Sequence, residues 1–182
     1  MEDMIRAIEN VYKSGSLSFL LSSYVDRDYY LQSYKECFKD NHIENVTDFN
    51  YSKCFNICIN ISDIDSHVGS QEFEQFLARN ANLYRVDVMM SVIAPYALVK
   101  YLKYKIQANQ ITLQSRSTAF LADQNIYDEK IRNILHSQRY TVLDDTQLIQ
   151  AVPAVVLELQ KDTPSVYNCL FEDSSSYYPY HN

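Results

Sequence analysis

The side chains best suited to proton transfer are four histidines, two of which have acidic neighbours. Glu44 follows His42 at a distance of two residues, and Asp63 and Asp65 precede His67. A catalytic histidine needs a nucleophile or a substrate within hydrogen-bond reach, which spacing along the chain does not establish. We therefore interpret His42 and His67 as solvated loop residues. A small hydrolase or transferase with an Asp, His and Tyr site remains the second hypothesis.

The chain lacks the patterns that bind nucleotides and metals. Its two glycines, Gly15 and Gly69, cannot build a glycine-rich phosphate loop. Cys54 and Cys58 are four residues apart, without the CxxC spacing of a zinc site. Asp63-Ile64-Asp65 supplies two carboxylates but no further oxygen ligands for a cation cage. We expect no cofactor and no metal, and we expect the cysteines to fill the core.

Charge is distributed unevenly along this acidic chain, whose net charge is −7. Eight acids and two bases lie in 36–74, and six acids and one base lie from residue 140 onward. The segment 100–116 has four bases and no acid. The net charge disfavours nucleic acid as the partner, because phosphate binding needs clustered lysine and arginine. It favours attraction of a basic protein.

Sixteen tyrosines accompany this charge, and a rigid ring with a polar tip is a favoured contact residue at protein interfaces. One interpretation is that the charge runs are ordinary solvated faces. The other is that acids and aromatic rings share one exposed surface that binds a basic partner. The candidate residues of that surface are Tyr30, Tyr34, Glu44, Asp48, Tyr51, Asp63, Asp65, Glu172, Asp173, Tyr177 and Tyr178.

The first part of the chain, 1–42, is predicted to be mainly helical. Apolar residues recur at helical spacing in three stretches, which are Met4–Tyr12, Leu17–Val25 and Tyr30–Phe38. Glu2 and Asp3 suit a helix N-terminus, and Gly15 supplies a stop.

The second part, 43–173, is predicted to mix strands and helices. Alternating apolar residues predict strands at 54–61, 84–93 and 96–106, with 111–113 extending the sheet. The last two long runs form a hairpin, although Pro95 is also compatible with a helix start at 96.

The remaining elements follow from shorter signals. Helices are predicted at 70–77, 126–137 and 145–150, a short extended segment at 141–143, and strands at 155–159 and 166–171. Residues 174–182 are expected to form a flexible tail. The whole chain is then one α+β domain, in which N-terminal helices precede a mostly antiparallel sheet with helices packed on one face.

The C-terminal half resembles the small acidic immunity proteins of bacterial toxin systems. The resemblance rests on the paired strands 84–93 and 96–106, the helix 126–137, Val152-Pro153 and the run Val166–Phe171. It implies a non-catalytic inhibitor that covers the basic active-site surface of a toxin. No residue role is transferred, because these families share no diagnostic motif.

The location and assembly of the chain follow from weaker features. The N-terminus lacks a signal peptide, and no stretch has the apolar length of a membrane span, so we expect a cytoplasmic protein that does not enter the membrane. A structural subunit that forms homo-oligomers through exposed strands is a third hypothesis. The oligomeric state stays open.

Overall fold

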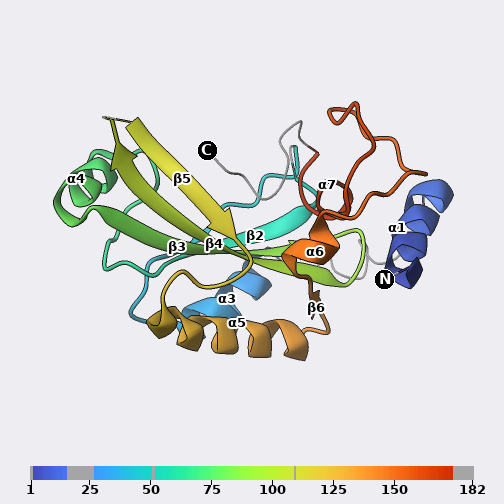
Figure 1. The fold of residues 1–182 in the computed structure, drawn as a ribbon. Coiled ribbons are helices and arrows are strands. Elements are labelled where there is room, and N and C mark those ends of the chain that lie inside the picture. Colours follow the sequence, from blue (N-terminus) through green and yellow to red (C-terminus); the bar gives the residue numbers. More distant parts are fainter. Residues whose placement is uncertain (1, 16–26, 51, 109, 174–182) are drawn as a thin grey trace.

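The computed structural model describes residues 2–15, 27–50, 52–108 and 110–173. Within those ranges, no helix combines the length and the apolar character needed to cross a membrane. Figure 1 shows the arrangement of the elements. In chain order they are α1 (Glu2–Ser14), α3 (Arg27–Cys37), β1 (Ile43–Asn45), β2 (Cys54–Asn60), α4 (Gln71–Asn80), β3 (Asn82–Ser91), β4 (Tyr96–Gln107), β5 (Gln110–Arg116), the 3-10 turn η1 (Ala122–Gln124), α5 (Asn125–Ser137), β6 (Thr141–Val142), α6 (Asp145–Leu148) and α7 (Val166–Leu170).

A six-stranded sheet organises the molecule. Its order is β1-β2-β3-β4-β5, all antiparallel, and the short β6 pairs in parallel with the start of β4. The predicted hairpin is confirmed as β3 and β4, with Val88 opposite Val99. The segment after Pro95 is therefore a strand and not a helix. Its β-branched and aromatic residues pack well on a pleated surface, which is the reason for this preference.

The first face of the sheet is covered by α3 and α5. Tyr34 of α3 and Leu135 of α5 are fully buried with Ile57, Val88 and Val99 in one apolar cluster. Figure 1 shows α3 and α5 side by side below the sheet. Their apolar residues recur at helical spacing, so one stripe of each helix faces the strands.

The opposite face is covered by α1, α7 and α4. Ile8 of α1 and Leu170 of α7 pack with Met89 and Leu98 at one end of the sheet. At the other end, α4 packs its Phe73 and Leu77 on Leu83, Leu102 and Tyr104, which form a third apolar cluster. The α+β class is confirmed, but helices cover both faces of the sheet and not one. The reason is that β3 and β4 present apolar residues on both sides, and each side must be buried.

Two predicted strands near the C-terminus are wrong. Residues 166–170 form helix α7, and 155–159 contain no strand. The hydroxyl of Ser165 accepts a hydrogen bond from the backbone N–H of Asn168, and the Asn168 side chain accepts one from the N–H of Ser165. This reciprocal cap favours a helical turn. The run from Val166 to Leu170 is buried on every side, so its apolar pattern carries no period.

The exposure of the four cysteines gives a way to test this packing. Cys54, Cys58 and Cys169 are buried, whereas Cys37 is half-buried, and all four thiols are free. Burial raises the pKa of Cys169 to about 12 and moves the pKa values of Cys54 and Cys58 well upward. Thiolate is the reactive form, so these three should resist alkylation.

We expect iodoacetamide at neutral pH to label Cys37 first in the native protein and all four cysteines in denaturant. Mass spectrometry of the intact protein and its peptides reports the labelled positions. The Cys37→Ser variant serves as the control and should take up almost no label until it unfolds. Native labelling of Cys54 or Cys169 at the rate of Cys37 would contradict the described core.

Candidate functional site

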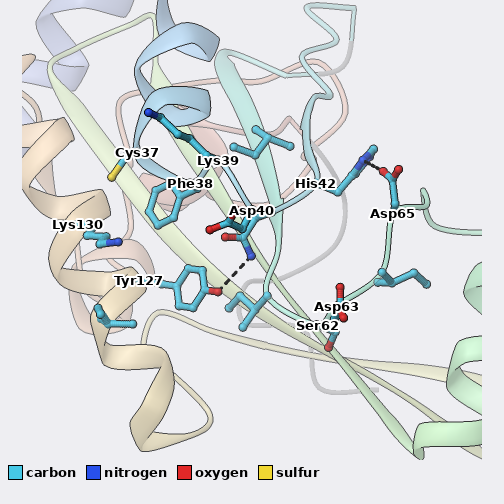
Figure 2. A pocket seen from close by; sticks show the side chains of 15 residues that line it. Cys37, Phe38, Lys39, Asp40, His42, Ser62, Asp63, Asp65, Tyr127 and Lys130 are labelled. Carbon is cyan, nitrogen blue, oxygen red and sulfur yellow. Dashed lines mark hydrogen bonds and ion pairs between the residues drawn. The ribbon is translucent and has the colours of Figure 1, made fainter.

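A hollow of about 800 Å³ lies at the β1 edge of the sheet. It is bounded by the end of α3 and the residues that lead into β1, by the loop that follows β2, and by the N-terminal half of α5 (Figure 2). Phe38 and Tyr127 form its floor, where their rings stack with centroids 5.6 Å apart. Three segments that are distant in sequence therefore build one concave surface.

A side-chain amide fixes the floor of the hollow. The Nδ2 atom of Asn41 donates to the carbonyl of Asn60 at 2.8 Å and to the hydroxyl of Tyr127 at 3.1 Å. These two bonds join the segment before β1 to the end of β2 and to α5. The hollow is thus held by tertiary contacts and does not depend on a ligand for its shape.

His42 connects the hollow to the sheet edge. Its Nε2 lies 2.7 Å from a carboxylate oxygen of Glu44, and its Nδ1 contacts a carboxylate oxygen of Asp65. A neutral imidazole has one N–H, so both contacts are hydrogen bonds only when both ring nitrogens are protonated. These contacts tie the loop that carries Asp65 to the β1 edge.

Glu44 is held from the other side by a buried cation. Its second carboxylate oxygen lies 3.4 Å from Arg85, whose side chain is about 5% exposed. The guanidinium of Arg85 also donates to the sulfur of Cys58, with its Nε at 2.8 Å. Glu44, Cys58, Asp87 and Lys100 are successive neighbours across β1, β2, β3 and β4. Burial raises the pKa of Asp87, while Lys100 and Arg85 oppose that shift.

A buried asparagine orders the loop that forms one wall of the hollow. The Nδ2 atom of Asn60 donates to the carbonyls of Ile64 and Ser66, at 2.8 and 3.1 Å. The backbone N–H of Ile64 donates to the carbonyl of Ser62, which tightens the turn. Asp63 and Asp65 are exposed on this ordered loop. The backbone that carries these two side chains is therefore ordered before any partner arrives.

The two walls of the hollow carry opposite charge. Asp63 and Asp65 lie on the loop wall, whereas Lys39 and Lys130 lie on the side of α3 and α5, as Figure 2 shows. Asp40 lies between them and adds a third carboxylate to the lining. The Nζ atom of Lys130 lies 5.6 Å from the ring centre of Phe38, which places its charge over the aromatic floor.

Three of the predicted partner-binding residues come together at this site. Glu44 and Asp65 contact His42, and Asp63 lines the hollow beside them, although the sequence placed Asp63 and Asp65 with His67. His67 is exposed at the far end of the same loop. The prediction missed Asn41, Lys39, Tyr127 and Lys130. It did not include Asp40 among the partner-binding residues, although Asp40 is an acidic neighbour of His42 in the sequence.

The tyrosine part of the prediction is wrong for two residues. Tyr30 is 7% exposed and Tyr34 is fully buried, so neither ring is available to a partner. Tyr30 packs against Phe55, and the hydroxyl of Tyr34 contacts the sulfur of Met90. Both rings face the sheet because α3 must bury one apolar stripe. Tyr51, Tyr177 and Tyr178 lie outside the described residues.

The three remaining predicted acids lie elsewhere, and two of them stabilise loops. The carboxylate of Asp173 accepts hydrogen bonds from the backbone N–H groups of 158–160 and faces Lys53 at 4.0 Å. A side-chain oxygen of Asp48 accepts from the N–H of Asn50. Glu172 is half-buried beside the bridge to Ser52. These acids do not join those of the hollow.

Comparison of the chain with protein-family models, with curated proteins and with solved structures finds no match in any of the three. Within the described part of the chain, no group of three His, Cys, Asp or Glu side chains is arranged to hold a metal ion.

Asn60 orders the loop wall, so replacing its side chain should lower the stability of the protein. Asn60→Ala removes two buried hydrogen bonds and leaves two carbonyls without a donor, so the free energy of unfolding should fall by about 1–3 kcal/mol. Urea denaturation measures this loss, and amide hydrogen exchange should accelerate in 61–68. Asn56→Ala, on the same strand and face, is the matched control, because the Asn56 side chain makes no hydrogen bond to any described residue, whereas the Nδ2 of Asn60 makes two. Equal losses in both variants would contradict this role of Asn60.

Proposed function

We propose that this protein is a non-catalytic binding domain that docks a basic protein partner in the hollow at the β1 edge. The observation that supports it most is the charged loop wall, where Asp63 and Asp65 are exposed on a loop already held by Asn60 and His42. A cationic side chain of the partner pairs with these carboxylates. An acidic neighbour of that cation faces Lys39 and Lys130 across the hollow.

Preorganisation favours such binding. Ordering a loop costs free energy on association, and a loop that is already ordered avoids much of this cost. Phe38 is itself buried, but the half-buried ring of Tyr127 that stacks on it and Ile126 at the rim, which is 56% exposed, offer apolar surface. A partner can therefore bury apolar surface between the charged contacts, which is the usual composition of a protein interface.

The finer proposal is an immunity-type inhibitor that covers the active-site surface of a toxin by binding in a 1:1 ratio. The net charge of −7 supports it, because long-range attraction raises the association rate with a basic partner. Recognition in this form rests on the carboxylates of the loop wall and not on Tyr30 and Tyr34, which are part of the core.

Affinity capture from the native host at low ionic strength tests the proposal. We expect the wild-type protein to retain a basic partner, and Asp63→Lys/Asp65→Lys to retain at least about tenfold less, because two attractive contacts become repulsive. Asp3→Lys/Glu158→Lys is the matched control, since it makes the same change in net charge at exposed positions outside the hollow. Calorimetry with the purified partner then gives the affinity and its salt dependence.

Two outcomes would contradict the proposal. One is that no basic protein is retained at low salt, where attraction between charges is strongest. The other is that both double variants lose the partner to the same extent, which would show a response to net charge alone. For the inhibitor, the activity of the captured protein should fall to zero at one equivalent of the wild-type chain and persist with the Asp63→Lys/Asp65→Lys variant.

A further inference from the structure

The edge strand β5 offers backbone groups that no other described strand uses. β5 pairs with β4 on one side, and Figure 1 shows it at the margin of the sheet. Gln107 and Gln110 form the last pair of this hairpin, across a two-residue connection. Hydrogen-bonded and non-hydrogen-bonded pairs alternate in an antiparallel ladder, and the pair that closes a two-residue hairpin is hydrogen-bonded. The N–H and C=O groups of Ile111 and Leu113 therefore point away from β4.

The open part of this edge spans 110–114. At its far end, Ser115 is buried, and the N–H of Ser117 lies 3.4 Å from a carboxylate oxygen of Asp145. Arg116 turns back to donate to the carbonyls of Thr118 and Ala119. Natural edges are protected by proline, by bulges or by charged side chains. The sequence from Gln110 to Gln114 has no proline and no charge, and its register with β4 is unbroken.

The two faces of this edge differ in chemistry. On one face, Ile106 and Ile111 are 42% and 43% exposed, and Leu113 continues the apolar cluster beneath α4. On the other face, Gln110, Thr112 and Gln114 are uncharged, and Lys103 and Lys105 stand on the neighbouring strand. An added strand would lie about 10 Å from β4, because strands are spaced by about 4.8 Å. Lysine and glutamate side chains can span that distance over the short side chain of Thr112.

We propose that β5 binds an extended segment of another protein in which acidic and apolar residues alternate. Main-chain hydrogen bonds to Ile111 and Leu113 would add the segment to the sheet as a further strand. Its apolar residues would cover Ile106 and Ile111, and its acids would face Lys103 and Lys105. Charge argues for such a partner over a second copy of this chain, because 100–116 contains four bases and no acid. The surface lies at the opposite edge of the sheet from β1 and its hollow.

Amide chemical shifts test this proposal directly. The probe is a capped synthetic heptapeptide in which glutamate and valine alternate, added to the ¹⁵N-labelled full chain at low salt. We expect saturable shifts at the amides of β5, with the largest at Ile111 and Leu113, and weaker binding as salt is added. The control peptide has lysine in place of glutamate and should not produce saturable shifts. Saturable shifts elsewhere, or equal binding of both peptides, would overturn the proposal.

Two pairs of variants distinguish the contribution of backbone hydrogen bonds to peptide binding from the contribution of charge. Ile111→Pro removes an N–H that β4 does not use and should weaken the peptide at least about fivefold, whereas Ile111→Val should not. Thr112→Glu should weaken it similarly by repulsion, whereas Thr112→Ser should not. The dispersion of each spectrum shows whether the variant is folded, and the Thr112 pair decides the result if Ile111→Pro is unfolded. Shifts in β5 that depend on protein concentration without peptide would assign the edge to a second copy and also overturn it.

Discussion

Burial of charge in the centre of the sheet is the constraint on which the candidate site depends. β3 is covered on both faces, yet one face carries Arg85 and Asp87. A buried ion without partners costs several kcal/mol. Neighbouring strands therefore supply Glu44, Cys58 and Lys100 in one row across the sheet. This row fixes the position of Glu44 at the β1 edge.

The position of one wall of the hollow depends on that row of side chains. Glu44, held by Arg85, positions His42, and His42 in turn contacts Asp65 on the loop that Asn60 orders from below. Each contact is more exposed than the one before it, from the buried Arg85 to the exposed Asp65. Exposed ion pairs contribute little to stability, so the outermost contact can be exchanged for a partner's cation at small cost. Buried contacts that hold the site, together with an outer ion pair that a partner can replace, are suitable for recognition.

The sequence predicted the parts of this structure that have a clear period. The alternating residues predicted two strands, which the structure contains as β3 and β4, and the helical spacing predicted the helix α5. The buried run at Val166 has no period, so the capping side chains decided its conformation. Tyr30 and Tyr34 are four residues apart on a helix with an apolar stripe, and this spacing already indicated the core more strongly than an interface. The hollow joins 37–43, 61–65 and 126–130, and local patterns carry no information about such long-range contacts.

Opposite charge at the two edges of one sheet allows two interactions that do not interfere. The acidic rim lies beside β1 and the basic segment lies in β4 and β5, with four strand spacings between the outer strands. At about 4.8 Å for each spacing this separation is roughly 19 Å, which exceeds the screening length of about 8 Å at physiological salt. A basic partner at the hollow is therefore little affected by Lys103 and Lys105. An acidic strand on β5 is likewise little affected by Asp63 and Asp65, so the two surfaces can be occupied together.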